Sequence, residues 1–296
     1  MIAFRVLLLT ILTMIAFAAN SLPCRLALKS ASIDAATFTS IRLASGVGVL
    51  YLLVRTRGNR MSMRGDWLSA VALFAYAAAF SFAYLSLPAG TGALLLFGAV
   101  QATMILAGLR NGEMLGAIQS AGVALAIAGL IGLVWPGVAA PPLLGAALMV
   151  CAGIAWGLYS LRGRGVGDPV SATAGNFLRA LPFALLTSAA ALPWAHYDGW
   201  GVLLALLSGG IASALGYVLW YAALPSLTAI RAAVVQLSVP VIAALGGAMI
   251  LDETISLRSA VASLATLGGI ALAIADRTRS TEAAARANLP TPPAPH

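Results

Sequence analysis

The sequence predicts an all-α integral membrane protein with ten transmembrane helices, built as two inverted five-helix repeats (5+5). Three observations predict this fold: an apolar composition, ten apolar segments of spanning length, and an internal repeat. Of the 296 residues, 61% are hydrophobic and only 9% are charged, and the mean hydropathy is +0.96. A chain with so few polar side chains cannot cover a water-facing globule, so lipid must be its main solvent.

Ten apolar segments remain when the chain is divided at charged residues, Pro/Gly clusters and short polar stretches. A helix needs about 20 residues to cross the hydrocarbon layer. Backbone groups inside lipid must be hydrogen-bonded within their own segment, so we predict helices and not strands. The segments cover residues 5–28, 33–55, 66–86, 88–108, 113–134, 141–160, 170–192, 200–222, 224–250 and 256–275.

The two halves of the chain match each other at a nearly constant shift. Residues 82–88 (FAYLSLP) align with residues 219–225 (LWYAALP), and the same shift aligns Arg42 with Arg179. A slightly larger shift aligns Glu113 with Glu253 and Gly129 with Gly269. Matches that keep one order along the chain indicate an internal duplication.

The repeat defines the predicted domains. Each copy contains five spans, and an odd number of crossings makes the second copy enter the membrane from the opposite side. We predict a first repeat over residues 1–136, an inverted second repeat over residues 137–276, and a disordered cytoplasmic tail over residues 277–296, which is Ala-rich and then Pro-rich. Arg5 and the apolar stretch after it also have features of a secretory signal, but the repeat requires this segment as a helix.

The basic residues predict the orientation of the chain. With the N-terminus inside, eleven of the 17 Lys and Arg residues fall on the cytoplasmic side, three fall outside and three lie within predicted helices. Basic residues hold loops on the cytoplasmic side. Both termini are therefore predicted to be cytoplasmic.

The same counts exclude other classes of protein. The formal charge of +8 would suit a nucleic-acid partner if the basic residues clustered, but they are spread through short loops. The two Cys and two His residues lie far apart, so we expect no metal site and no cofactor. The sequence has no HExxH or GxSxG motif and no paired aspartate, so we do not expect an enzyme.

All nine acidic residues fall at segment ends, in loops or in the tail. Proton-driven pumps commonly place a titrating side chain within the bilayer. The sequence therefore favours facilitated, gradient-driven export of a solute without proton coupling, with export coupled to protons as the alternative. Glu113 and Glu253 are expected to cap the first turns of the helices that follow them, where a carboxylate meets the positive end of the helix dipole.

Arg42 and Arg179 lie within predicted spans, where a guanidinium costs about 2.5 to 3.5 kcal/mol on an insertion scale. Two interpretations compensate this cost. One or both side chains could face a water-filled cavity and attract a carboxylate-bearing solute. Alternatively, each could bond to the carbonyl groups of neighbouring helices as a structural contact.

Aromatic and amide side chains form a pattern typical of a binding cavity. Tyr76, Phe80 and Tyr84 recur at intervals of four, along one face of the third predicted helix. Further candidates are Phe97 and Gln101 in the fourth helix, Trp156 in the sixth, and Gln236 and Ser238 before Pro240 in the ninth. Aromatic stripes also occur as lipid-facing belts or as packing, but Tyr76 and Trp156 lie too deep in their spans for a belt.

These residues resemble the drug/metabolite transporter superfamily of the EamA type, and within it the bacterial aromatic amino acid exporters. The resemblance covers residues 5–276. It is carried by Phe17-Ala18-Ala19-Asn20, where the family often has Trp-Gly-x-Asn, by its counterpart Trp156-Gly157, and by the pairs Arg42 with Arg179 and Glu113 with Glu253. Phe17 and Ala18 depart from the family pattern.

The resemblance implies ten helices in two inverted bundles, a central cavity and the export of amino acids across the bacterial inner membrane. It makes Tyr76, Phe97, Trp156 and Ser238 the first candidates for substrate binding. The other candidates are Phe80, Tyr84, Gln101, Gln236, Asn20, Arg42 and Arg179.

We therefore expect a secondary transporter that works by alternating access, because two near-equivalent halves can open a central site to either side in turn. Its expected partners are a small-molecule substrate and membrane lipid, and we expect a monomer. The substrate would be an amino acid, preferably aromatic or otherwise large and neutral, held by stacking. An exporter of drugs, quaternary cations or other metabolites is the alternative, whereas inverted repeats disfavour a structural protein.

Overall fold

The chain is helical over most of the residues that the computed structural model describes, which are 2–56, 64–110, 112, 115–137, 140–163, 166–223 and 235–287. Within these ranges, β-structure is limited to one bridge between Ile33 and Tyr197. The predicted all-α fold class is therefore confirmed.

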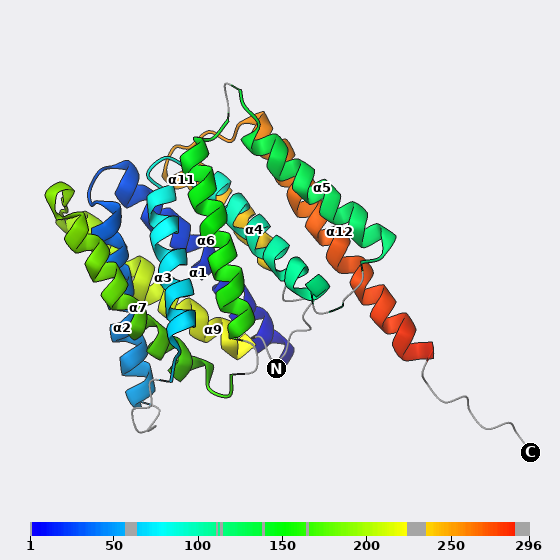
Figure 1. Ribbon diagram of the computed structural model, residues 1–296, viewed down its shortest axis with the longest axis horizontal. Coiled ribbons are helices and arrows are strands. Elements are labelled where there is room, and N and C mark those ends of the chain that lie inside the picture. Colours follow the sequence, from blue (N-terminus) through cyan, green and yellow to red (C-terminus); the bar gives the residue numbers. More distant parts are fainter. Residues whose placement is uncertain are drawn as a thin grey trace, which may run out of the picture.

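The helices follow the predicted apolar segments. They are α1 (Ile2–Lys29), α2 (Ala35–Thr56), α3 (Trp67–Ala83), α4 (Ala89–Arg110), α5 (Ala117–Val134), α6 (Leu143–Arg162), α7 (Pro169–Ala190), η1 (Leu192–Trp194), α8 (Gly199–Leu206), η2 (Leu207–Leu215), α9 (Gly216–Ala223), α11 (Ser238–Ile250) and α12 (Leu257–Ala287) (Figure 1). The elements α8, η2 and α9 follow one another without a break and cover the eighth predicted segment. The ninth segment lies partly outside the described residues, and α11 covers its end.

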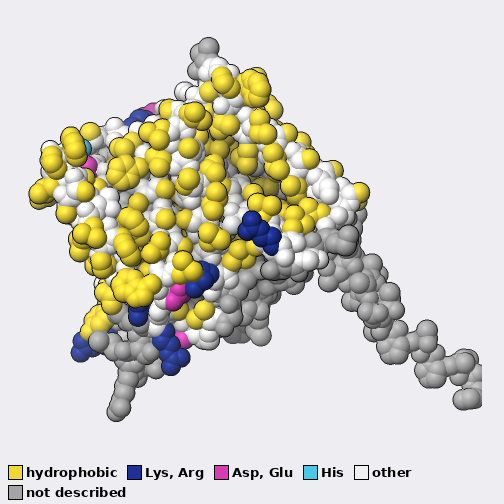
Figure 2. Space-filling view, in the orientation of Figure 1, with side chains coloured by type: hydrophobic (Ala, Val, Ile, Leu, Met, Phe, Trp, Pro, Cys, Tyr) yellow, Lys and Arg dark blue, Asp and Glu magenta, His cyan; other side chains and the backbone are white. Residues whose placement is uncertain are grey.

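Many of these helices have the length and hydropathy of membrane spans. Within the described part of the chain, six helical stretches are long and apolar enough to cross a membrane: α1, α2, α4, α5, α6 and the stretch from α8 to α9. On the face drawn in Figure 2, hydrophobic side chains cover the middle, and most charged side chains lie toward the lower edge. These features support a multi-pass membrane protein, while ten crossings remain a prediction.

Aspartate residues begin several of the helices. Carboxylate oxygens of Asp34, Asp66, Asp168 and Asp198 accept hydrogen bonds from backbone N–H groups in the first turns of α2, α3, α7 and α8. The start of a helix has unpaired N–H groups and favours negative charge, so an aspartate there satisfies both. The position of these acids at segment ends therefore has a structural cause.

The helices form a bundle with a helix pair at its side (Figure 1). Helix α2 packs on α7, α3 packs on α6 and α7, α4 packs on α6 and α11, and α1 packs on η2, α9 and α11. Helices α5 and α12 pack mainly on each other and reach the bundle through α4.

The last helix is longer than the sequence predicted. We expected a span over residues 256–275 and a disordered tail from residue 277, whereas α12 continues to Ala287. Residues 282–287 (EAAARA) consist of strong helix formers. The apolar pattern thus located the span but underestimated how far local propensity extends the helix.

Glycine residues let the backbones of α5 and α12 touch. A Cβ atom added to Gly122 would lie 2.6 Å from the carbonyl oxygen of Gly269, and one added to Gly269 would lie 2.6 Å from the backbone nitrogen of Ala126. Small residues commonly permit this close approach between membrane helices. The contact fixes the spacing of the pair.

Gly269 and its neighbour Gly268 provide a matched test of this contact. We expect Gly269→Ala to lower the free energy of unfolding by about 1–3 kcal/mol, because backbone atoms cannot make room for the added carbon. Gly268→Ala has open space around the added carbon, so it should be neutral or slightly stabilising. Thermal unfolding of the purified variants in detergent measures the difference, and equal midpoints would contradict the contact.

Candidate functional site

A small cavity lies where helices of the two halves of the chain meet. Its volume is about 20 Å³, and α1, α3, α4, α6, η2 and α9 contribute its walls. The lining residues are Phe17, Asn20, Ser21, Tyr76, Phe80, Leu96, Phe97, Trp156, Ala212 and Tyr217. Five of the predicted site residues, Asn20, Tyr76, Phe80, Phe97 and Trp156, are therefore brought together here.

Trp156 lies at the centre of an aromatic cluster beside this cavity. Its ring centroid is 4.9 Å from the rings of both Tyr76 and Tyr217, and 5.5 Å from the ring of Tyr159, on which it stacks. Phe17 meets the indole edge-on at 6.5 Å. Offset and edge-to-face contacts are the favoured geometries for aromatic pairs, so these contacts stabilise the cluster.

Arg42 lies directly behind the Tyr76 and Phe80 side chains of the cavity wall. Only 1% of Arg42 is exposed. Its Nη2 donates to the Tyr76 hydroxyl at 2.9 Å, and its Nε donates to the Ser213 hydroxyl at 3.4 Å. The guanidinium carbon lies 4.8 Å from the Phe80 ring centroid and 5.2 Å from that of Tyr76, within cation–π range.

The charge of Arg42 has no acidic partner among the described residues. The ion pairs found there are Arg25–Glu253 and Arg162–Asp66, and neither includes Arg42. In addition, Nη1 of Arg42 is buried and lacks a hydrogen-bond partner among the described atoms. A buried, unsatisfied donor on a charged group is costly, so this position in the structure needs an explanation.

Asn20 completes the polar network around the Tyr76 hydroxyl. Its Nδ2 donates to the Tyr76 oxygen at 2.9 Å. Its Oδ1 accepts hydrogen bonds from Ser208 at 2.7 Å and from Ser213 at 3.4 Å. Asn20, Tyr76 and Arg42 are thereby held in fixed orientations by side chains from four elements.

The π-helical turns of η2 position its two serines. Ser208 and Ser213 are five residues apart, and the i to i+5 hydrogen bonds of a π-helix bring such residues closer in angle than an α-helix does. A Cβ atom on Gly209 would clash with the carbonyl oxygen of Arg42 and the hydroxyl of Ser45. The glycine therefore allows η2 to approach α2 closely enough for Ser213 to reach the guanidinium.

The other predicted site residues do not line the cavity. The Tyr84 hydroxyl donates to the carbonyl of Ala89 at 3.2 Å, the Ser238 hydroxyl donates to the carbonyl of Val235 at 2.7 Å, and Nη1 of Arg179 donates to the carbonyl of Gly175 at 3.0 Å. Gln101 is buried in α4 and Gln236 is half-buried before α11. Of these side chains, Tyr84 lies next to the cavity wall, because its ring packs edge-to-face on Phe80 at 4.7 Å.

Several residues of the site were not among the predicted candidates, namely Phe17, Ser208, Ser213 and Tyr217. The repeat offered a signal for two of them. At the shift that aligns Arg42 with Arg179, Ser213 corresponds to Tyr76, and Tyr217 corresponds to Phe80. No local motif marked Ser208, because its position depends on the π-helical geometry of η2.

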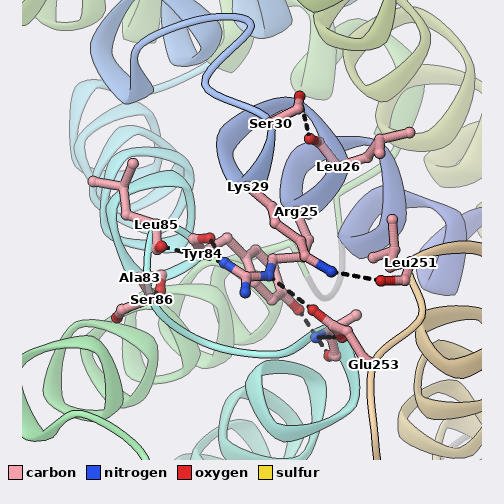
Figure 3. Close-up of polar contacts among 11 residues, drawn as sticks. Arg25, Leu26, Lys29, Ser30, Ala83, Tyr84, Leu85, Ser86, Leu251 and Glu253 are labelled. Carbon is pink, nitrogen blue, oxygen red and sulfur yellow. Dashed lines mark hydrogen bonds and ion pairs between the residues drawn. The ribbon is translucent and has the colours of Figure 1, made fainter.

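One end of the bundle is closed by a buried ion pair (Figure 3). Nε of Arg25 lies 2.8 Å from Oε1 of Glu253, with 12% and 10% of the two side chains exposed. Nη1 of Arg25 also donates to the carbonyl groups of Tyr84 at 2.8 Å and Leu85 at 3.2 Å. Lys29 donates to the carbonyl of Leu251 nearby at 2.5 Å. The cluster ties α1 to the loops that follow α3 and α11.

Glu253 corrects one expectation from the sequence. We predicted that it caps the helix that follows it, but its Oε2 accepts a hydrogen bond at 2.7 Å from the backbone nitrogen of Ala89, at the start of α4. The electrostatic reason is the expected one, a carboxylate at a helix N-terminus. The packing of the loop before α12 against α4 decides which helix it caps. The repeat partner Glu113 lies outside the described residues.

The opposite end of α3 is tied by a more exposed pair. Nη2 of Arg162 lies 2.8 Å from Oδ1 of Asp66, with 41% and 51% of the side chains exposed. Burial would raise the pKa of Asp66, but hydrogen bonds from Ser69 and the charge of Arg162 outweigh it and lower the pKa to about 2. The contribution of this carboxylate to stability is present above its ordinary pKa of 3.8 and is lost as the pH falls through about 2.

Comparison with known proteins defines the class. Residues 143–275 match the EamA-like transporter family. The chain is 58% identical over 274 residues to "Uncharacterized protein PA1977" of Pseudomonas aeruginosa, covering 92% of this chain and 96% of that protein. A solved structure named "Crystal structure of protein" superposes on this chain with a TM-score of 0.63 at 19% sequence identity. The superposition covers 90% of this chain and 97% of that one, and at this identity it shows the fold alone.

The family match, together with the all-helical fold and several helices of spanning length, supports a membrane transporter of the drug/metabolite superfamily. The match over residues 143–275 relates the second half of the chain to the EamA-like transporter family. The matched family is one of transporters.

The two ion pairs provide a prediction about stability. Glu253→Gln keeps the size of the side chain but leaves Arg25 as a mostly buried charge without a counter-charge, so we expect a loss of about 3–5 kcal/mol in the free energy of unfolding. Asp66→Asn keeps a helix-capping oxygen and disrupts an exposed pair, so it should cost at most about 1 kcal/mol. Thermal unfolding in detergent compares the two variants. Equal losses of stability would contradict the expectation that the more buried pair contributes more.

Proposed function

We propose that the protein is a secondary transporter that exports amino acids, preferably aromatic and other large neutral ones, by alternating access without proton coupling. The observation that carries this proposal is the aromatic cavity, which helices of both halves build beside the buried charge of Arg42. An aromatic side chain can stack within such a cluster, while a few polar groups fix its orientation. The proposed setting is the bacterial inner membrane, with the chain acting as a monomer surrounded by lipid.

The helix contacts support two repeats of five helices. Under the repeat, α1 corresponds to α6, α2 to α7, α3 to the stretch from α8 to α9, α4 to α11, and α5 to α12. When each helix is replaced by its repeat partner, the contact of α3 with α6 becomes the contact of η2 and α9 with α1, which is also present. In the same way, the contact of α4 with α6 becomes the contact of α11 with α1. The helices α2 and α7 are repeat partners that contact each other, and so are α5 and α12. A two-fold relation between the halves accounts for all of these contacts.

The close contacts of α5 and α12 follow the same rule. At the shift that aligns Glu113 with Glu253, Gly122 corresponds to Ala262, and Gly129 corresponds to Gly269. Gly122 contacts Gly269, and Gly129 contacts the carbonyl of Ala262. Each contact is therefore the repeat image of the other, as inverted halves of a transporter would require.

Alternating access is supported by the closure of the cavity and the different ties at its two ends. A cavity of about 20 Å³ has room for about one water molecule, which needs about 10–15 Å³, and is too small for an amino acid. The Arg25 cluster and the Arg162 pair lie at opposite ends of α3. We propose that substrate reaches the cavity when one of these ends opens. The predicted cytoplasmic termini place the Arg162 end inside.

The acidic residues support transport without proton coupling. Five of them, Asp34, Asp66, Asp168, Asp198 and Glu253, cap helix N-termini. Asp252 is exposed in the loop after α11. None of the described cavity-lining residues is acidic. A transporter that lacks a titrating group at its binding site has no direct means to exchange a proton for its substrate.

Export of drugs or quaternary cations is the alternative function. Aromatic side chains around Trp156 favour it, because an aromatic cage can bind a cation. The positive charge of Arg42 directly behind Tyr76 and Phe80 opposes it. The amino acid proposal accounts for both the rings and the charge.

Loss of Trp156 should reduce transport. Trp156→Ala removes the central ring of the cluster, so we expect phenylalanine counterflow into proteoliposomes to fall about tenfold at equal protein levels. Trp194→Ala is the control, since Trp194 is 74% exposed in η1, away from the cavity. Unchanged flux in Trp156→Ala would remove this residue from the site.

A pH gradient should have little effect on this transport. We expect phenylalanine counterflow to change by less than about twofold when a gradient is imposed, because the site lacks a titrating acid. A panel that adds tetraphenylphosphonium and other cations tests the alternative in the same vesicles. Gradient-driven uptake of cations without counterflow of amino acids would favour drug export instead.

A further inference from the structure

We propose that Arg42 and Asn20 form a carboxylate-binding site, and that the hydroxyl of Tyr76 occupies the position of a ligand oxygen in the ligand-free protein. This inference rests on the proposed function and deepens it, because it assigns the group of the substrate that the protein recognises. The expected ligand is an aromatic compound that carries a carboxylate.

Two donors from different helices converge on one oxygen atom. Nδ2 of Asn20 in α1 and Nη2 of Arg42 in α2 each lie 2.9 Å from the Tyr76 hydroxyl oxygen in α3. A neutral phenol is a weak acceptor for a guanidinium. A carboxylate oxygen in the same place would accept both hydrogen bonds with charge assistance, which roughly doubles their strength.

The unpaired nitrogen of Arg42 shows that the Tyr76 hydroxyl is an incomplete partner. A guanidinium presents parallel N–H donors that match the two oxygens of a carboxylate. Tyr76 meets only Nη2, whereas Nη1 is buried without a hydrogen-bond partner among the described atoms. A carboxylate that replaced the Tyr76 oxygen would supply the missing acceptor for Nη1 as well.

The two donors are held in place in the absence of a ligand. Ser213 accepts the hydrogen bond of Arg42 Nε, and the Phe80 ring lies 4.8 Å from the guanidinium carbon. Ser208 donates to Asn20 at 2.7 Å and so turns the amide nitrogen toward Tyr76. Preorganised donors lose little conformational entropy on binding, which favours affinity.

The charge balance of the site also favours an anionic group. No carboxylate among the described residues pairs with Arg42, and both ion pairs found there lie at the ends of α3. A buried guanidinium is stabilised by an opposite charge in hydrogen-bond contact. The ligand is the remaining source of that charge within the described site.

Movement of Tyr76 would join recognition of the carboxylate to opening of the aromatic cavity. The Tyr76 ring lies 4.9 Å from Trp156 and 5.5 Å from Phe80. When a carboxylate displaces the hydroxyl, the ring must leave these contacts, which enlarges a cavity of about 20 Å³ and exposes a face of Trp156. An aromatic side chain on the same ligand can then occupy that face.

Tyr76→Phe tests whether the Tyr76 hydroxyl competes with the ligand, because competition and direct contact change the KM in opposite directions. The variant keeps the ring but removes the competing oxygen, so the KM for phenylalanine counterflow should fall about threefold or more. If the hydroxyl instead contacted the substrate directly, the KM would rise, and this result would overturn the proposal. Tyr197→Phe is the matched control with an expected unchanged KM, because Tyr197 is 68% exposed and does not line the cavity.

Arg42→Gln tests the recognition of the carboxylate. Binding is measured as thermal stabilisation by 3-phenylpropionate, which has only the carboxylate, and by phenylethylamine, which has only the amine. We expect the wild-type protein to prefer 3-phenylpropionate, and Arg42→Gln to weaken its binding about 100-fold while leaving phenylethylamine unchanged. Equal binding of both compounds by the wild-type protein, or a preference retained in folded Arg42→Gln, would overturn the proposal.

The two proposals fail in different ways. If the wild-type protein binds 3-phenylpropionate through Arg42 but shows no counterflow of any amino acid, the amino acid function is wrong and the carboxylate site stands. If phenylalanine is transported but the preference for a carboxylate is absent, the site is wrong and the function stands. Tyr76→Phe keeps the test decisive even if Arg42→Gln does not fold.

Discussion

The guanidinium of Arg42 is the constraint around which the two halves of the protein meet. It bonds to Tyr76 in one half and Ser213 in the other, and the repeat places these two residues at corresponding positions. The charge therefore lies between equivalent positions of the two halves. The close approach at Gly209, the π-helical turns of η2 and the orientation of Asn20 all serve to surround this buried group with polar atoms.

Arg42 and its repeat partner Arg179 make different contacts, and the reason is steric. One guanidinium fills the space between positions 76 and 213, so the repeat partner of Arg42 cannot occupy it at the same time. Arg179 donates instead to the carbonyl of Gly175, one turn earlier in its own helix. The sequence left a cavity role and a structural role open for both arginines. The structure places Arg42 beside the cavity and gives Arg179 a helix-carbonyl contact.

The helices were predictable because lipid leaves the backbone few alternatives. The length of the apolar segments and the charges between them located nearly every described helix, and the largest departure is the extension of α12 to Ala287. The site was less predictable. Helical periodicity brought Tyr76 and Phe80 to one wall, but it also selected Tyr84, which lies at the end of α3 beside the Arg25 cluster. Ser208 and Glu253 depend on a π-helix and on loop packing, which one sequence does not encode locally.

Helix α3 connects the Arg162 pair, the Arg42 network and the Arg25 cluster. Asp66 at its start pairs with Arg162, Tyr76 in its middle holds Arg42 and Asn20, and the carbonyl of Tyr84 at its end binds Arg25. Arg25 and Arg162 are also repeat partners, yet the Arg25 pair is nearly buried and the Arg162 pair is about half exposed.

This inequality gives the ends of α3 different strengths. Breaking a buried pair by removal of one partner costs about 3–5 kcal/mol, whereas an exposed pair contributes at most about 1 kcal/mol. In this conformation the Arg25 end is therefore the more firmly closed. A ligand that displaced Tyr76 would act on the one helix that both ends hold. Its binding would therefore influence which end opens. A ligand can shift the populations of two conformations only if it interacts differently with each of them.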